Sequence, residues 1–317
     1  MGLPFLRKAP EGGAGISFHD NEIRYVELSG QGGSYRLEAS SFITSPTPVL
    51  EQGMLRDVKI LEPLVGRLGE ELEGNFPMGI TLGLPPRNVM LRVVTIPEMD
   101  IEDARGALQW DFEKYFPFPA NEAVYDIVDI SADAGEAPGE MKLLVAAARS
   151  RLVEQFISLF STLDAEISSV EPSLIGAFRS ILGPVPGFSG GYLMLLLEDS
   201  STQLILGSGS SALLFRTLLV GLGEETTRED SLDSIVREVR STLGFVKGQF
   251  RDVMVNSLVL AGPHGEDAAL QNRLREELGE LSLLSFPLWN TWGMEAPPVR
   301  PQGWEYALGL ALRDVIA

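Results

Sequence analysis

A pattern of three strands separated by polar turns occurs twice in this chain, and it constrains the fold more than any other feature. Near the start, apolar and alternating runs are separated by two polar turns, in the order "GISF", "HDNE", "IRYVELS", "GQGG" and "SYRLEASSFIT". The arrangement returns at residues 192–221 as "YLMLLLEDSSTQLILGSGSSALLFRTLLVG". Such runs joined by short polar turns predict antiparallel strands. The internal repeat therefore predicts two related halves, each of which begins with three strands.

Helices and strands alternate after each triplet. In the first half, an apolar stripe predicts a helix over residues 59–72, and the buried strand "MGITLGLPP" follows it. In the second half, "DSLDSIVREVRSTLGFVKGQ" predicts a helix capped by Asp230 or Ser231, and "WEYALGLALRDVI" predicts the closing helix. This order of elements predicts an α/β protein with two mixed sheets and a cleft between them.

Residues 89–165 are expected to form an inserted unit of strand, helix, two strands and helix. Asp100 is expected to cap the first of these helices, and Pro117 to end it, because proline disfavours a helical residue before it. The apolar face of this helix comprises Ile101, Ala104, Leu108, Phe112 and Tyr115. The acidic turn "SADAGEAPGE" separates the two strands, and the second helix, over residues 151–163, is expected to bury Val153, Phe156, Ile157 and Phe160.

The expected domain division places the first half at residues 1–187, with the insert at about 89–165, and the second half at residues 188–317. Pro184, Pro186 and the segment "GFSGG" make the stretch between the halves a hinge or linker. The last helix is expected to complete the second half or to pack back on the first.

Charge and cysteine content exclude several classes of function. With 44 acidic and 25 basic residues, the net charge is -19, which repels nucleic acid and anionic lipid. The chain has no cysteine, which excludes disulfides and thiolate sites and agrees with a reducing cytoplasm. With His19 and His264 as the only histidines, we expect no metal site. No apolar run approaches the roughly 20 residues of a membrane helix, so we expect no direct membrane insertion.

The segment "GLPPRNVMLRVVTIPEMDIEDARGALQWDFEKYFPFPANEAVYDIVDI" carries a resemblance to a known family. Its GLP, P-x-M, A-x-x-W and Y-x-P-F-P elements resemble, in order, the pattern of the PilM family of type IV pilus assembly proteins. Further matches are "GISFHDNEIRYVEL", "LLVAAARSRLVEQF", "VEPS", "IVREVRSTLGFVKGQ" and "YALGLALR". The family is similar to FtsA and to the cytoplasmic domain of GspL. The resemblance implies the actin-like ATPase fold, with two RNase-H-like halves and a small α/β subdomain inserted in the first.

The resemblance also shows how the nucleotide loops depart from the pattern. Ser17 stands where the family has an acid and His19 where it has glycine. In the second loop Leu196 replaces the acid and Glu198 the glycine, and a carboxylate there repels a phosphate. The degenerate loops comprise Ser17, His19, Asp20, Asn21, Asp199, Ser200, Ser201 and Gly262. With no catalytic residue assigned, the expected protein is a pseudo-ATPase without a resident cofactor.

Two enzymatic alternatives stay open. If the second loop aligns with the family pattern in a shifted register, Asp199 becomes the acid for magnesium, and Ser200, Ser201 and Thr202 become the donors to phosphate. The chain is then a divergent ATPase of pilus or type II secretion assembly that binds ATP. A sugar or acetate kinase of the same superfamily is the other alternative. His19 and His264 are both expected to face the cleft, where they either share an ion or a hydrogen bond or act independently.

The resemblance implies a binding partner as well. It implies a scaffold in the cytoplasm, recruited to the inner membrane, whose inserted subdomain and first half form a groove for the N-terminal peptide of a PilN-like membrane protein. Through PilN and PilO the scaffold would join the inner-membrane pilus assembly complex. The residues expected to contact the partner are Arg87, Val89, Arg92, Trp110 and Tyr115.

Two aromatic groups allow more than one interpretation. The cluster Trp110, Phe112, Tyr115, Phe116 and Phe118 is either core or a docking surface, with Trp110 off the apolar stripe of its helix. Trp289 and Trp292 precede the proline-rich "EAPPVRP", and this stretch either packs its indoles onto the second half or forms a ligand-like arm.

Overall fold

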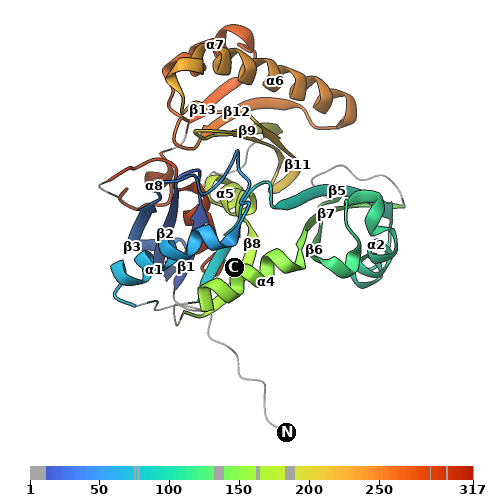
Figure 1. Ribbon diagram of the computed structural model, residues 1–317. Coiled ribbons are helices and arrows are strands. Elements are labelled where there is room, and N and C mark those ends of the chain that lie inside the picture. The colour runs from blue at the N-terminus through green and yellow to red at the C-terminus, as the bar shows by residue number, and fades with distance from the viewer. Residues whose placement is uncertain are drawn as a thin grey trace.

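The first half is built on a five-stranded sheet in the computed structural model, which describes residues 12–74, 76, 79–131, 139–161, 165–182, 190–250, 252–285, 287–297 and 299–316. Its strand order is β3-β2-β1-β4-β8 (Figure 1). The strands are β1 (Gly12–Phe18), β2 (Glu22–Gln31), β3 (Ser34–Thr44), β4 (Ile80–Leu84) and β8 (Ile167–Pro172). The first three strands are antiparallel, whereas β4 pairs in parallel with both β1 and β8.

The second half repeats this sheet. Its order, β11-β10-β9-β12-β13, places the second strand triplet and the two following strands as in the first sheet. The strands are β9 (Gly191–Leu197), β10 (Thr202–Ser208), β11 (Ser211–Leu218), β12 (Val255–Ala261) and β13 (Ser282–Ser285). Again the triplet is antiparallel and the last two strands run parallel to its first strand. The predicted pair of RNase-H-like halves is confirmed.

A three-stranded antiparallel sheet forms the insert in the first half, with the order β5-β7-β6. Its strands are β5 (Val89–Pro97), β6 (Ala123–Asp129) and β7 (Glu140–Arg149), and the 3-10 turn η2 (Ala120–Glu122) precedes β6. Helix α2 (Ile101–Tyr115) covers one face of this sheet. The apolar core beneath the helix comprises Val94, Ala104, Leu108, Phe112, Phe116, Phe118, Leu143 and Val145. Both outer strands, β5 and β6, present an edge that pairs with no other described strand.

Helices form layers around the two large sheets. On the first sheet lie η1 (Val58–Leu61), α1 (Glu62–Glu71) and α4 (Ser150–Phe160), whereas α6 (Arg228–Gln249) and α7 (Ala268–Glu277) cover the outer face of the second (Figure 1). The 3-10 turn η4 (Glu225–Thr227) directly precedes α6. Three helices complete the described elements: α5 (Ser173–Leu182), α8 (Leu288–Thr291) and α9 (Glu305–Leu312). Because α5 packs on β9 and β12 as well as on α9, it lies between the halves.

The last helix, α9, is buried along all of its eight residues and packs on β1 and α5. Small residues permit this close approach. A Cβ atom at Gly15 would lie 2.4 Å from the carbonyl oxygen of Ala307, and one at Gly309 would lie 1.7 Å from the carbonyl oxygen of Gly176. The helix that ends the second half in sequence therefore fills the space between the first sheet and α5.

Two expectations about helices were wrong. Ile157, which was expected to be buried, is 43% exposed. Helix α6 begins at Arg228, so its N-cap is Thr227 rather than Asp230 or Ser231. Asp100 occupies the N-cap position of α2 as predicted, although its side chain makes no capping hydrogen bond.

The two tryptophans before α9 pack on the first sheet, so the expected packing onto the second half was wrong. Trp289 and Trp292 are buried with Val26 and Leu28 of β2 and with α9. The indole of Trp292 also donates a hydrogen bond of 2.7 Å to the carbonyl oxygen of Ser180. Since α9 carries this segment back to the first half, the first sheet is the apolar surface within reach.

Two expected features lie outside the described residues. Most of the acidic turn between β6 and β7 falls on residues 132–138, and the hinge with Pro184 and Pro186 falls on residues 183–189. The boundary between residues 187 and 188 belongs to that second stretch, so the domain division remains a prediction.

We expect Gly309→Ala to destabilise the protein by on the order of 3 kcal/mol, because the added methyl group meets a helix backbone that cannot move alone. Gly106→Ala on α2 is the matched control. A Cβ atom there meets nothing within 4 Å, so the change should stabilise its helix by about 0.5–1 kcal/mol. Urea unfolding followed by circular dichroism measures both effects. Equal midpoints for the two variants would contradict the packing described for α9.

Candidate functional site

Three loops meet at the boundary between the halves. They are the turn after β1 (His19–Asn21), the turn after β9 (Glu198–Ser201), and the loop after β12 that begins at Gly262. The backbone N–H of Ser200 donates to Oδ2 of Asp20 at 2.9 Å, and a ring nitrogen of His264 lies 2.7 Å from Oδ1 of Asp199. The fold thus brings together the eight residues that the sequence assigned to the nucleotide loops.

The contact between Asp20 and Ser200 joins the two halves directly. The carboxylate of Asp20 belongs to the first half and accepts the hydrogen bond from a backbone N–H of the second. Burial raises the pKa of Asp20, whereas the hydrogen bonds from Ser200 act in the opposite direction. The carbonyl oxygen of Asp20 in turn accepts from the backbone N–H of Val49, which holds the turn in place.

Glu198 and His19 face each other deeper in the cleft. Oε1 of Glu198 lies 4.0 Å from Nδ1 of His19, and Oε2 accepts hydrogen bonds from Ser201 at 3.1 Å and Gln203 at 3.4 Å. The other ring nitrogen of His19 lies 3.0 Å from the hydroxyl oxygen of Ser17. Burial and then the charge of Asp20 raise the pKa of Glu198 to about 7. Burial and then Arg24 lower the pKa of His19 well below its usual value.

Each histidine therefore contacts a different carboxylate of the turn after β9. His19 is buried beside Glu198, whereas His264 is partly exposed beside Asp199. The hydrogen bond from His264 is the largest cause that lowers the pKa of Asp199. Among the residues that the structure describes, no group of three histidine, aspartate or glutamate side chains could hold a metal ion.

The loop after β12 uses its glycine N–H within the protein. Gly262 has a φ angle of +87°, which favours glycine, and its N–H donates to Oε1 of Glu305 at 2.7 Å. Glu305 is the first residue of α9 and is buried, and burial is the main cause that raises its pKa. Sequence reasoning missed Glu305, because nothing in its surroundings in the sequence points to a loop that lies 43 residues earlier.

A cavity of about 330 Å³ opens beside these loops, and its cations are paired with acids. Arg24 and Arg300 both line it, and both form ion pairs with Glu22. The guanidinium of Arg24 also lies 5.0 Å from the centre of the Trp304 ring. Both arginines are thus held by groups of the protein itself.

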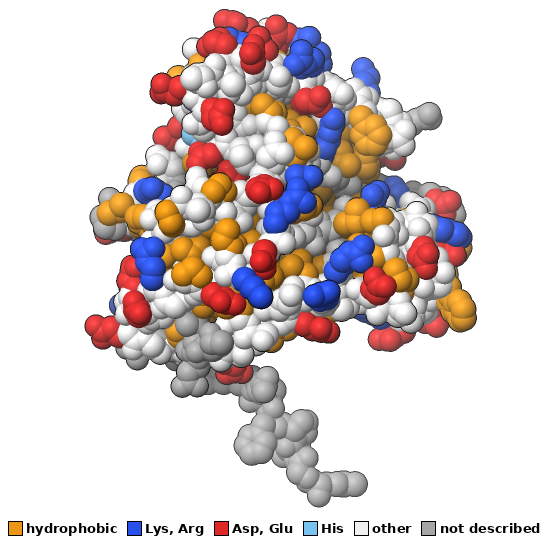
Figure 2. Space-filling model, viewed as in Figure 1, with side chains coloured by type: hydrophobic (Ala, Val, Ile, Leu, Met, Phe, Trp, Pro, Cys, Tyr) orange, Lys and Arg blue, Asp and Glu red, His pale blue; other side chains and the backbone are white. Residues whose placement is uncertain are grey.

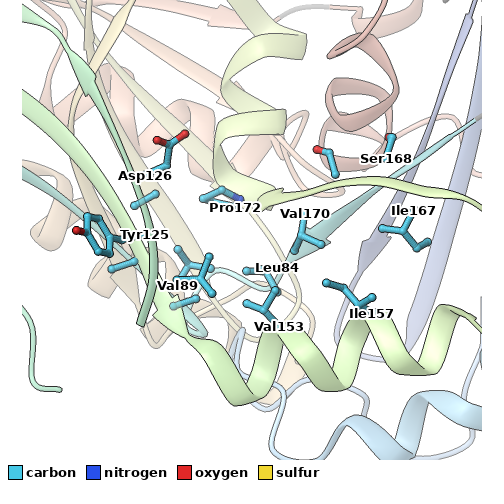
Figure 3. Close-up of a pocket in the computed structure, with 15 residues that line it drawn as sticks. Leu84, Val89, Tyr125, Asp126, Val153, Ile157, Ile167, Ser168, Val170 and Pro172 are labelled. Atoms are coloured by element: carbon cyan, nitrogen blue, oxygen red, sulfur yellow. The ribbon is translucent and has the colours of Figure 1, made fainter. Parts of the chain in front are cut away.

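An apolar groove lies on the other side of the first half, between the inserted sheet and the large sheet. Its volume is about 360 Å³, and Figure 3 shows side chains of α4 below it with those of β4 and β8 beside it. The groove is lined by β6 and β8, which are the edge strands of their sheets among the described strands. Its lining residues include Val124, Val153, Ile157, Ser169 and Val170.

The expected partner residues divide between two places. Val89 lines the apolar groove, and it also lines a larger cavity of about 760 Å³ between β5 and β11. Arg87, Arg92 and Tyr115 line only the larger of these two cavities. Trp110 lies on α2 with 92% of its surface exposed and lines neither of them, whereas Phe112, Phe116 and Phe118 are core. Sequence reasoning missed Val124, which lines the groove and is 50% exposed although it is apolar.

We expect Glu198→Gln to change how the free energy of unfolding depends on pH. The folded state raises the pKa of Glu198 from 4.5 to about 7. The protonated side chain therefore contributes its full stabilisation of the folded state below pH 4.5, and this stabilisation is lost as the pH rises through about 7. The variant cannot ionise at this position, so its stability relative to the wild type should increase between pH 5 and pH 8, by roughly 1–3 kcal/mol.

Urea unfolding at several pH values measures this change. Glu280→Gln is the control, because it makes the same substitution at an exposed position of the second half. A stability difference between wild type and Glu198→Gln that is constant across this range would show that the buried carboxyl does not titrate there.

Known structures share the whole architecture. The structure described as a PilM-PilN type IV pilus biogenesis complex matches with a TM-score of 0.81 and 22% identity, over 98% of this chain and 100% of that chain. The ethanolamine utilization protein EutJ from Carboxydothermus hydrogenoformans matches with a TM-score of 0.51 and 12% identity, over 98% of this chain and 90% of that one. At these identities, the matches establish the fold, which is the actin-like ATPase fold.

A family comparison completes this evidence. The model of the family described as type IV pilus assembly protein PilM matches residues 15–175. This range begins within β1 and extends through β2, β3, the complete inserted unit and β8. It covers more than half of the 317 residues. The chain therefore belongs to the PilM family of type IV pilus assembly proteins.

Proposed function

We propose that this protein is a scaffold of type IV pilus assembly that binds the N-terminal peptide of a PilN-like membrane protein in the groove between β6 and β8. The observation that carries the proposal is the juxtaposition of two strand edges across an apolar cavity. An edge strand offers unpaired backbone N–H and C=O groups, and an extended peptide can add to it as a further strand.

The lining of the groove suits apolar side chains of such a peptide. Val124 is 50% exposed although it is apolar, and Ile157 from α4 faces the same cavity. Covering these two side chains would remove apolar surface from water, which stabilises a complex. Ser169 supplies a polar group, because its buried hydroxyl has no hydrogen-bond partner among the described residues.

The comparisons support the choice of partner. The solved structure that covers this whole chain is described as a complex of PilM with PilN, and that description applies to the proteins in it. No helix in the described part of the chain is long and apolar enough to cross a membrane. We propose that the protein works in the cytoplasm and reaches the inner-membrane assembly complex through PilN-like partners.

We expect a labelled N-terminal peptide of the PilN-like protein from the same organism to bind. The double variant Val124→Asp/Ile157→Asp should weaken this binding at least about tenfold, because both new carboxylates would be buried against the peptide. Fluorescence anisotropy measures the affinity. Met254→Asp is the control, since it places a carboxylate at an exposed apolar residue of the second half. Binding that the double variant leaves unchanged would place the peptide elsewhere.

We propose further that the nucleotide loops have lost their function. In an active site of this kind, loop N–H groups and a metal would bind phosphate oxygens. Here the N–H groups of Ser200 and Gly262 donate instead to Asp20 and Glu305. Glu198 adds a carboxyl group to the same cleft, where an ionised form would repel phosphate. These residues do not fit a bound ATP phosphate, which supports a pseudo-ATPase.

We expect millimolar Mg²⁺ATP to leave the melting temperature of the wild type unchanged, because a ligand that binds only the native state must raise it. Differential scanning fluorimetry measures this, with Asp199→Ala in parallel. An increase in the wild type that is lost in the variant would show a divergent but working ATPase site and would overturn the pseudo-ATPase proposal. The peptide-binding proposal would stand independently of that outcome.

A further inference from the structure

A second groove lies between the other edge of the inserted sheet and the second half. Its volume is about 760 Å³, and the strands along it are β5 and β11. Each is the edge strand of its sheet among the described strands, and the two strands lie in contact where the groove begins. The groove thus offers unpaired backbone groups from two strands, just as the β6–β8 groove does on the opposite side of the insert.

The charge of this groove is opposite to that of the molecule. Its described lining contains four cationic residues and no acidic residue, although the chain has 44 acidic residues and 25 basic ones. The four are Arg87, Arg92, Lys142 and Arg216. Arg216 is neutralised in part by Glu238 at 2.6 Å, whereas Arg87 and Arg92 form no ion pair with a described residue. The side chains coloured blue in Figure 2 include several that lie where the upper half meets the insert.

Apolar side chains complete the lining. Phe215 from β11 and Phe250 after α6 are partly buried, and Phe245 on α6 is 50% exposed at the rim. Leu91 and Val93 project from β5 on the face away from α2. A ligand of this groove therefore needs apolar groups as well as negative charge.

We propose that the β5–β11 groove binds an extended acidic segment of a partner protein, one in which acidic and apolar residues alternate. In an added strand, successive side chains point to opposite faces, so alternation would direct apolar groups to the aromatic residues and carboxylates to Arg87 and Arg92. Nucleic acid is the less suitable anion, because the net charge of -19 repels a long polyanion. The groove is separate from the β6–β8 groove, so this proposal does not rest on that one.

Fluorescence anisotropy with three labelled ten-residue peptides and an oligothymidine tests the proposal. The peptides alternate glutamate with leucine, lysine with leucine, and glutamate with serine. We expect the glutamate–leucine peptide to bind at least about tenfold more tightly than the other three probes and to bind more weakly as the salt concentration rises. Arg87→Glu/Arg92→Glu should weaken its binding at least about tenfold.

Arg237→Glu/Arg275→Glu is the matched control, because it makes the same change of charge at exposed residues of α6 and α7, and it should preserve the affinity. Circular dichroism should show both double variants folded. Equal binding of the lysine and glutamate peptides, equal or tighter binding of oligothymidine, or an unchanged affinity in Arg87→Glu/Arg92→Glu would each overturn the proposal. Self-association of the wild type that Arg87→Glu/Arg92→Glu abolishes would also overturn it, since the groove would then hold a second copy of the chain.

Discussion

The packing of α9 between β1 and α5 is the interaction on which the rest of the structure depends. It requires backbone to approach backbone, and Gly15, Gly176 and Gly309 permit that approach because they have no side chain there. Once α9 occupies this space, its first two residues reach the cleft. Glu305 binds the N–H of Gly262, and Tyr306 joins the apolar core that contains α5 and the second sheet. One helix thus connects the first sheet, the second sheet and the loop after β12.

This connection changes what the cleft can do. In the proposed pseudo-ATPase, the groups that would otherwise hold phosphate oxygens hold the two halves together through Asp20, Ser200, Gly262 and Glu305. The cleft consequently contains several carboxyl groups whose ionisation burial disfavours, including Glu198 with a pKa of about 7. Opening this cleft would break the hydrogen bonds that join the two halves, so the contact disfavours opening in a catalytic cycle. This agrees with a role as a scaffold.

The inserted sheet provides the other general feature. Because it has three strands and α2 covers one of its faces, its two edges remain available, one toward each large sheet. The two resulting grooves differ in chemistry. Among the described residues, the lining between β6 and β8 is mainly apolar with a single acid, Asp126, whereas the lining between β5 and β11 combines aromatic residues with arginines. In our proposals one small subdomain therefore offers two distinct peptide sites to an assembly complex.

The sequence by itself determined the strand triplets, the alternating helices, the inserted unit and the family, because period-two patterns, turn residues and ordered motifs are local. It also identified the loops that meet in the cleft, since they follow equivalent strands of a repeat. Only the tertiary structure decided that Glu305 binds Gly262, that Trp292 packs on the first sheet, and that Ile157 lines a groove. A periodic pattern shows which face of an element is apolar, but the element that covers this face comes from a distant part of the chain. The pKa values of Glu198 and His19 depend in the same way on burial by several segments, which no single stretch of sequence specifies.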